Sequence, residues 1–217
     1  MTDLGDHYRS SRERLTALLA AGDEAEWGAP VAACPGWDVH DVVAHLVGVI
    51  EDGLAGRLAG PPDEVLTAEE VARHRDDAPG ELLGRWAELA PPFEAVVTDR
   101  QIVPAVLDVV SHEHDIRAAV GRPGARDDEV VLLGARRLTD SLDVAATVTF
   151  ELGGARVASP PMAGPAYTVR TSAFEVLRFR LGRRSRDQVG ALEWSADPEP
   201  ILDDLFVFGP ASLPLVE

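Results

Sequence analysis

Apolar side chains recur every three or four residues through the first half of the chain, a spacing that gathers them on one face of a helix. Proline pairs and Gly-Pro clusters separate these segments. The predicted helices cover residues 4–21, 38–60, a short segment from Thr67 to Pro79, a long segment from Gly80, and residues 103–120. Four long amphipathic helices joined by short connections predict an antiparallel bundle.

Two helix starts in this half carry capping signals. Asp38 followed by Asp41 has the spacing of a capping box, and Thr67 followed by Glu70 repeats that pattern. The pair Pro91-Pro92 is expected to interrupt or kink the long helix around it, because proline lacks the backbone N–H that helix bonding requires.

The pattern changes after the sequence Gly-Arg-Pro-Gly that ends at Gly124. Short stretches rich in Val, Thr and aromatic residues predict strands, and they alternate with helical segments. The predicted strands lie within 148–154, 155–159, 166–172 and 191–197, and the predicted helices at 128–144, 173–182 and 198–205. A turn at Gly153-Gly154 is expected to join the first two strands. A few strands mixed with helices indicate a small α+β domain. The expected fold class is therefore α+β, with a helix bundle at 1–124 and the second domain at 125–217.

Composition narrows the classes of function. The chain has 217 residues, 46% of them hydrophobic, which predicts a globular protein with a sizeable core. Its net charge of −17 argues against a nucleic-acid partner, because binding phosphates requires a basic face.

Localisation is predicted from two further observations. The single cysteine, Cys34, excludes an internal disulfide and fits a reducing cytoplasm. The first residues lack the apolar core of a signal peptide, and no uninterrupted apolar stretch approaches the roughly 18 residues of a membrane span. We therefore expect a cytoplasmic protein without a membrane partner.

Two segments far apart in the sequence carry residues that bind metals. Asp108 stands four residues before His112, so both side chains lie on one face of the last helix of the bundle. His45, on the helix that begins at Asp38, can complete a set of three ligands. Three protein ligands with open positions are typical of a catalytic metal centre. The alternative is an exposed Asp108 and a buried His112 that hydrogen-bonds to a backbone carbonyl.

Neighbours of His112 offer further interpretations. Glu113 and His114 are possible substitute ligands, but His114 lies about 200° around the helix from His112, so both histidines cannot line one site. Asp115, three residues after His112, can hydrogen-bond a ligand and orient its ring.

The segment Cys34-Pro35-Gly36-Trp37 has no second cysteine nearby for a redox couple. It predicts a turn, with Trp37 packed against the helix start.

A dense basic cluster follows the helix predicted at 173–182. Arg183 and Arg184 in this cluster are candidates for binding an anionic group, because a guanidinium matches a carboxylate with two parallel hydrogen bonds. The alternative is a helix end that favours positive charge.

Three segments resemble one family. The first, CPGWDVHDVVAHLVG, is similar to a metal-binding signature of the mycothiol-dependent maleylpyruvate isomerase family. LDVVSHEHDIRAAVGRPG resembles its second metal segment, and FEVLRFRLGRRSRDQV resembles its C-terminal module. The resemblance implies a DinB-like four-helix bundle with His45, Asp108 and His112 as the metal ligands. The isomerase itself carries a glutamate where this chain has Asp108.

The resemblance also implies the cofactors and the reaction. We expect a divalent metal, zinc in the first place and nickel, iron or manganese as alternatives, together with mycothiol. The implied enzyme is a thiol transferase, or an isomerase that works by addition, rotation and elimination on a small electrophile. The alternative is a non-catalytic metal-binding or regulatory module of the same fold. The expected partners are a small thiol and an electrophilic substrate, and the chain is expected to be a monomer or a homodimer.

Overall fold

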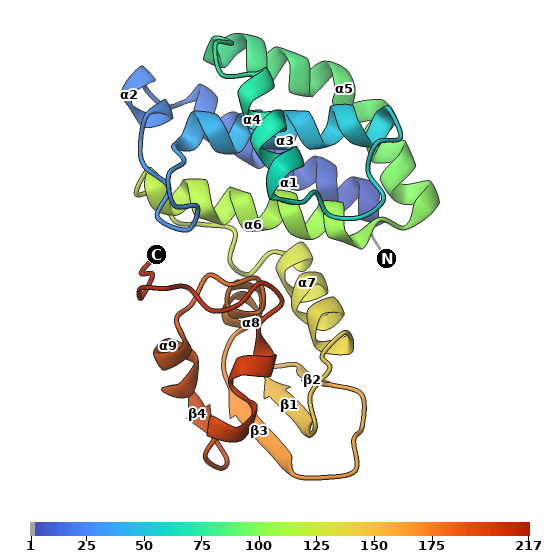
Figure 1. The fold of residues 1–217 in the computed structure, drawn as a ribbon, viewed down its shortest axis with the longest axis vertical. Coiled ribbons are helices and arrows are strands. Elements are labelled where there is room, and N and C mark those ends of the chain that lie inside the picture. The colour runs from blue at the N-terminus through green and yellow to red at the C-terminus, as the bar shows by residue number, and fades with distance from the viewer. Residues whose placement is uncertain (1–2) are drawn as a thin grey trace. The chain divides into compact units, whose positions relative to one another are not determined.

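The computed structural model describes residues 3–217. The chain forms two compact units, the first ending at Gly124 and the second beginning at Ala125 (Figure 1). The first unit is helical, and the second combines helices with a four-stranded sheet. The predicted α+β fold class is confirmed.

Four long helices build the first unit. They are α1 (Leu4–Ala20), α3 (Val39–Leu54), α5 (Pro79–Arg100) and α6 (Val103–Ala119), and the short helices are α2 (Glu24–Trp27) and α4 (Glu64–Arg73). Helix α1 packs against α5 and α6, while α3 packs against α4, α5 and α6. The side chains of Leu15, Leu46, Trp86 and Ile116 are fully buried between these helices. Burial of this apolar stripe is what holds the bundle together.

Helix α3 begins as the sequence predicts and ends earlier. The backbone N–H of Asp41 donates to Asp38 Oδ1 at 3.0 Å, and that of Asp38 donates to Asp41 Oδ2 at 3.2 Å, which completes the predicted capping box. The helix ends at Leu54 instead of near residue 60. Gly56 adopts a φ of +71°, and the N–H of Arg57 donates to the carbonyl of Asp52, so the chain turns away through a glycine-dependent cap.

The second predicted capping box is wrong. Helix α4 begins one turn earlier, where the Asp63 side chain accepts a hydrogen bond from Leu66 N at 2.9 Å. Thr67 therefore lies inside the helix, and Glu70 lies in its second half and is fully buried.

The proline pair does not interrupt α5. The helix is continuous from Pro79 to Arg100 with Pro91 and Pro92 inside it. Both prolines are exposed, as are Ala87 and Glu88 one turn earlier, whose carbonyls lose their helical partners. Water can satisfy those carbonyls, which explains why the pair is tolerated on this face.

Gly48 lets α4 approach α3 closely. A Cβ atom at this position would lie 2.5 Å from Glu70 Cβ and 3.1 Å from Glu70 Cα. Gly84, in the exposed face of α5, has nothing within 4 Å of the same added atom.

The two glycines predict opposite effects of one substitution. Gly48→Ala should destabilise the protein by about 1–3 kcal/mol, because relief of the clash requires α3 and α4 to separate. Gly84→Ala should stabilise it by up to about 1 kcal/mol through helix propensity. Urea unfolding of both variants tests this, and a stabilised Gly48→Ala would contradict the close packing of α4.

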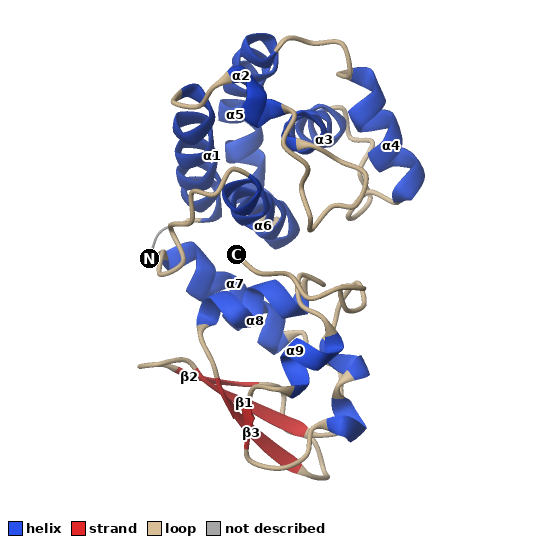
Figure 2. Ribbon diagram, turned by 90° about the vertical axis from the view of Figure 1, so that its left-hand side faces the viewer, coloured by secondary structure: helices blue, strands red, loops and turns tan. Residues whose placement is uncertain are grey.

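The second unit is a sheet with helices on one face (Figure 2). Its elements are α7 (Glu129–Asp140), β1 (Thr147–Glu151), β2 (Arg156–Ala158), β3 (Ala166–Arg170), α8 (Ala173–Arg180), α9 (Arg186–Gly190), β4 (Glu193–Trp194) and the 3₁₀ turns Glu199–Ile201 and Asp203–Leu205. The sheet order is β2-β1-β3-β4, with β1 and β3 parallel and both edge strands antiparallel. Val148, Phe150, Val176 and Phe179 belong to the core that joins the sheet to α7 and α8.

Some of the predicted turns, strands and helices of this unit are observed, and others are shorter or of another type. The hairpin between β1 and β2 turns at Gly153, as predicted, with a φ of +69°. Ser172 caps α8 by accepting a hydrogen bond from Glu175 N at 3.1 Å. The last predicted strand is reduced to two residues, and the last predicted helix is two 3₁₀ turns.

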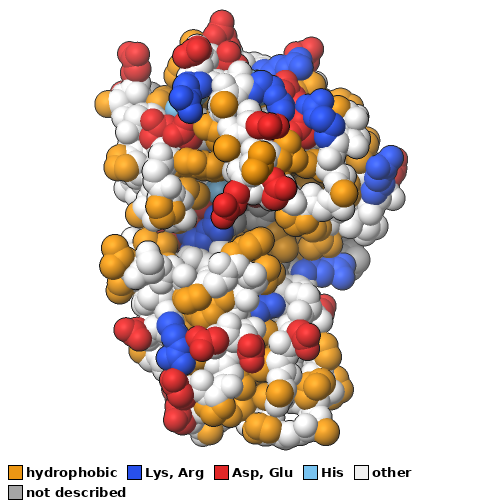
Figure 3. Space-filling model, in the orientation of Figure 1, with side chains coloured by type: hydrophobic (Ala, Val, Ile, Leu, Met, Phe, Trp, Pro, Cys, Tyr) orange, Lys and Arg blue, Asp and Glu red, His pale blue; other side chains and the backbone are white. Residues whose placement is uncertain are grey.

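Acidic side chains and arginines are intermixed on the face drawn in Figure 3. Exposed ion pairs of this kind contribute little to stability and give a solvated surface. In the part of the chain that the structure describes, no helix has the length and apolar character to cross a membrane.

Candidate metal centre

Helices α3 and α6 bring the three predicted ligands together. His45 Nε2 lies 3.7 Å from Asp108 Oδ1, and His112 Nε2 lies 3.5 Å from the same oxygen. One donor atom from each residue lies within 4.8 Å of the other two. The imidazole rings meet edge to face, with centroids 5.4 Å apart. The structure therefore places both Nε2 atoms and one carboxylate oxygen around a common point.

A carboxylate holds the other nitrogen of each histidine. His45 Nδ1 lies 2.8 Å from Glu70 Oε2, and His112 Nδ1 lies 3.0 Å from Asp115 Oδ2. Glu70 and Asp115 are almost completely buried. When Nδ1 donates its proton to a carboxylate, the lone pair of a neutral imidazole is at Nε2, where a metal binds. The ring nitrogens that face Asp108 are therefore the ones available for a metal.

The electrostatics of the site favour a cation. Burial lowers the pKa of His45, but its hydrogen bonds to Asp108 and Glu70 outweigh this and raise the pKa above its usual value. Burial likewise opposes protonation of His112, yet the hydrogen bonds to Asp108 and Asp115 raise its pKa well above the usual value. The pKa of Asp108 is held far below its usual value by both histidines, against the effect of burial. The site thus attracts positive charge.

The donor set fits a divalent transition metal. Two neutral imidazoles and one carboxylate are the ligands that Zn²⁺ takes in catalytic sites, and nickel, iron and manganese accept the same set. The histidine side chains are 5% and 8% exposed, whereas that of Asp108 is 30% exposed. Asp108 is therefore the most exposed of the three donors.

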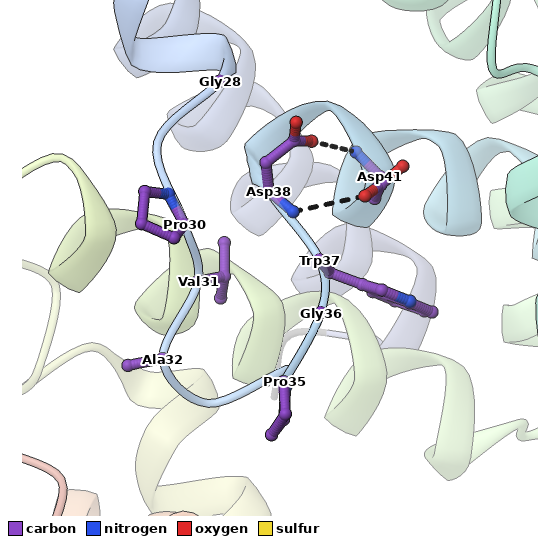
Figure 4. Close-up of a pocket in the computed structure, with 9 residues that line it drawn as sticks. All are labelled: Gly28, Pro30, Val31, Ala32, Pro35, Gly36, Trp37, Asp38 and Asp41. Carbon is purple, nitrogen blue, oxygen red and sulfur yellow. Dashed lines mark hydrogen bonds between the residues drawn. The ribbon is translucent and has the colours of Figure 1, made fainter.

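The loop before α3 approaches the same histidines. It turns as the sequence predicts (Figure 4), with the N–H of Trp37 donating to the carbonyl of Cys34 at 3.0 Å. The Trp37 and His45 rings are 5.4 Å apart, and Cys34 Sγ lies 3.7 Å from Asp115 Oδ2 and 3.9 Å from His112 Nδ1. Cys34 thus lies beside Nδ1 of His112, whereas Asp108 lies beside Nε2 of the same ring.

The substitute ligands considered from the sequence point elsewhere. Glu113 is fully buried and accepts hydrogen bonds from Arg14 and Arg117. His114 is also buried, and it is in none of the donor clusters formed by residues 3–217. The alternation around α6 explains this, because successive residues of a helix point about 100° apart.

Glu70 is the functional residue that sequence reasoning missed. Its spacing from Thr67 suggested a helix cap, whereas its carboxylate hydrogen-bonds to a histidine 25 residues away. A short-range sequence pattern cannot predict a contact between residues that are 25 positions apart. The available signals were its position in the apolar half of an amphipathic segment and the glycine at position 48 that faces it.

Replacing Glu70 tests its role without removing a ligand. Glu70→Gln keeps the shape but removes the charge that orients and polarises His45, so zinc affinity should fall about 10–100-fold. Competition with a chromogenic chelator measures this. Glu69→Gln, on the exposed neighbouring residue, is the matched control and should bind zinc like the unmodified protein. Equal affinity of both variants would contradict the role of Glu70.

The basic cluster of the second unit is engaged in internal contacts. Arg184 donates to both carboxylate oxygens of Glu175 at 2.8 Å and has Glu217 at 3.5 Å. Arg183 donates to the carbonyl of Leu181 at 2.6 Å. Arg184 therefore faces the carboxylates of Glu175 and Glu217.

The fold and the site together define a class: a helix bundle that gathers two imidazoles and a carboxylate, followed by an α+β unit. Residues 8–122 match the family model described as the mycothiol maleylpyruvate isomerase N-terminal domain. The match spans more than half of the chain and includes all three donors, so the chain belongs to this family of enzymes. The family predicted from the sequence is confirmed.

Solved structures agree at the level of the fold. Crystal structures of mycothiol-dependent maleylpyruvate isomerase and of a histidine-to-alanine mutant of that enzyme align with TM-scores of 0.54 and 0.55. Each is 18% identical, and each alignment covers 92% of this chain and 99% of the other. No curated protein matches the sequence.

Proposed function

We propose that the protein is a metal-dependent enzyme that uses mycothiol, or a closely similar small thiol, to act on a small electrophile. A divalent metal, zinc in preference to nickel, iron or manganese, binds His45, Asp108 and His112. The reaction is either a cis–trans isomerisation like that of maleylpyruvate isomerase or the transfer of the thiol to the electrophile. A reducing cytoplasm suits both a thiol co-substrate and the free thiol of Cys34.

One observation carries this proposal: each histidine of the cluster has its own buried carboxylate at Nδ1, and both Nε2 atoms face one aspartate. Two protonated histidines would balance only two carboxylates, and two neutral histidines would balance none. The additional buried acids, Glu70 and Asp115, leave a negative balance that a divalent cation offsets.

The residues of the chain prepare this chemistry in separate ways. A bound divalent metal lowers the pKa of a coordinated thiol and thereby supplies a nucleophile near neutral pH. Glu70 and Asp115 fix the orientation of the two imidazoles. Trp37 lies against the His45 ring, and Asp108 is the partly exposed donor at which thiol and electrophile would approach.

In this proposal the second unit supplies an anion-binding guanidinium, from Arg183 or Arg184. The guanidinium of Arg184 already binds the carboxylate of Glu175 with two hydrogen bonds, so an anionic ligand at Arg184 would take the place of that carboxylate. An anionic group of the thiol or the substrate would be bound with the same geometry.

The experiment supplies the purified, zinc-loaded protein with mycothiol and a panel of electrophiles that includes maleylpyruvate. Appearance of the trans isomer identifies an isomerase, and a thioether product identifies a transferase. Thermal unfolding with zinc, with mycothiol and with both should show stabilisation by each added ligand. The His45→Ala/His112→Ala double variant is the inactive control, and Arg183→Lys and Arg184→Lys identify the guanidinium involved.

Stabilisation by zinc without any effect of mycothiol, and without turnover, would overturn the enzymatic proposal. That result would favour the non-catalytic metal-binding module instead.

A further inference from the structure

Arg178, on α8, is fully buried, and a glutamate from a distant segment lies against its guanidinium. Arg178 Nε donates to Glu217 Oε2 at 3.1 Å, and Arg178 Nη2 donates to Glu217 Oε1. The contact therefore has the parallel, two-bond geometry with which an arginine binds a carboxylate ligand. The proposed function does not account for this pair, because it concerns Arg183 and Arg184.

Two further guanidinium groups lie near this pair. All three group around the ring of one phenylalanine, Phe174, with their central carbon atoms 4.7 Å from its centroid for Arg126, 5.8 Å for Arg184 and 5.9 Å for Arg178. Arg184 Nη1 also lies 3.5 Å from Glu217 Oε1. Guanidinium groups gathered in this way create a local positive field that attracts small anions, although the chain has a net charge of −17.

The segment that carries Glu217 is mostly exposed. Residues 211–217 contain no helix or strand and run past α8 (Figure 1). The backbone of Leu215 exchanges two hydrogen bonds with the side chain of Gln188, on α9, whereas Val216 is 90% exposed. A segment of this kind opens locally at a low cost in free energy, apart from the cost of separating Glu217 from its arginine.

Separating Glu217 from Arg178 is the costly part of that opening. Loss of a carboxylate from a buried guanidinium is strongly destabilising. A carboxylate from solution that takes the place of Glu217 removes this cost. Glu175, by contrast, belongs to α8 itself and donates both its oxygens to the hydrogen bonds of Arg184, so it cannot leave without disturbing the helix. Glu217 is therefore the carboxylate that a free anion can replace.

We propose that Arg178 is the centre of a binding site for small carboxylates, and that the side chain of Glu217 occupies this site as an internal competitor. A ligand carboxylate accepts the two hydrogen bonds of Arg178, Glu217 moves into solvent, and the segment 211–217 is released from α8. The concentration of a carboxylate thereby controls the order of this segment. All the contacts that carry the proposal lie within the second unit, so it does not rest on the metal centre.

The probe is succinate, a small dicarboxylate without a reactive double bond, titrated calorimetrically into the full-length protein near neutral pH. In Glu217→Gln the competitor keeps its length and loses its charge, so succinate should bind about tenfold more tightly than to the unmodified protein. Glu199→Gln removes a carboxylate that Arg186 binds at the surface, and as the matched control it should bind succinate like the unmodified protein. Arg178→Lys in the Glu217→Gln background should lose the gain, because an ammonium group lacks the two parallel donors.

Hydrogen exchange gives a second readout that needs no variant. In the unmodified protein, succinate should speed exchange of the Leu215 amide, whose N–H donates to Gln188 Oε1 at 3.2 Å while the segment is bound. Potassium chloride at the same ionic strength should have a much smaller effect, because screening weakens the ion pair without replacing the carboxylate.

The proposal is overturned if Glu217→Gln binds succinate no more tightly than the unmodified protein, if succinate leaves the exchange of Leu215 unchanged, or if chloride acts as strongly as succinate. Each of these results would make Glu217 a structural tie and nothing more. The His45→Ala/His112→Ala variant should bind succinate like the unmodified protein. Failure of the enzymatic proposal would therefore leave the carboxylate site intact, and turnover without succinate binding would do the reverse.

Discussion

The His112→Ala variant should lose about 100-fold or more in zinc affinity. Structural zinc sites bind with about 10–16 kcal/mol shared among four ligands, so one ligand accounts for roughly 3 kcal/mol, on the order of a 100-fold change. Removal of His112 also leaves Asp108 and Asp115 without their shared partner. Chelator competition and metal analysis of the purified variant measure the loss.

His114→Ala is the control for that experiment. This histidine lies two residues further along α6 and is buried away from the donor cluster. Its variant should retain zinc affinity, provided that circular dichroism shows an intact helical fold. If the His114→Ala variant loses zinc and the His112→Ala variant keeps it, the metal ligand on α6 is His114, and our assignment of His112 is wrong.

Glu113→Ala should destabilise the helical unit by about 3 kcal/mol. The Glu113 side chain is fully buried and accepts hydrogen bonds from Arg14 Nε at 2.9 Å, Arg14 Nη2 at 2.7 Å and Arg117 Nε at 3.0 Å. It therefore ties α1 to α6, and its removal leaves two partly buried arginines without that carboxylate. Urea unfolding of the variant measures the effect.

The same variant separates stability from metal binding. Glu69→Ala, at an exposed position of α4, should change stability by no more than about 0.5 kcal/mol. Folded Glu113→Ala should still bind one zinc, because Glu113 faces away from the cluster. If Glu113→Ala is as stable as the unmodified protein, Glu113 does not stabilise the packing of α1 against α6.

Local signals explain what the sequence predicts well. The Asp38–Asp41 capping box depends on residues three positions apart, and the joint orientation of Asp108 and His112 depends on four. Both follow from helix geometry alone. The helices and the hairpin turn at Gly153 are also predicted from short-range signals, namely apolar periodicity and a glycine pair between two strand-like segments.

Contacts between distant segments explain what the sequence does not show. Glu70 reaches His45 only because Gly48 permits α4 to pack closely on α3, and this depends on tertiary structure. The continuity of α5 through Pro91-Pro92 depends on which face is exposed, which is set by the packed bundle. The early end of α3 depends on the positive φ of Gly56, one of several glycines near the predicted end.

X-ray absorption spectroscopy of the zinc-loaded protein tests the central claim most directly. Without thiol, we expect two imidazole nitrogens and light oxygen ligands at about 2.0–2.2 Å, and no sulfur. Addition of mycothiol should introduce one sulfur at about 2.3 Å. A sulfur ligand in the thiol-free protein would mean that Cys34 binds the metal, and a spectrum unchanged by mycothiol would mean that the thiol does not; either result contradicts the account.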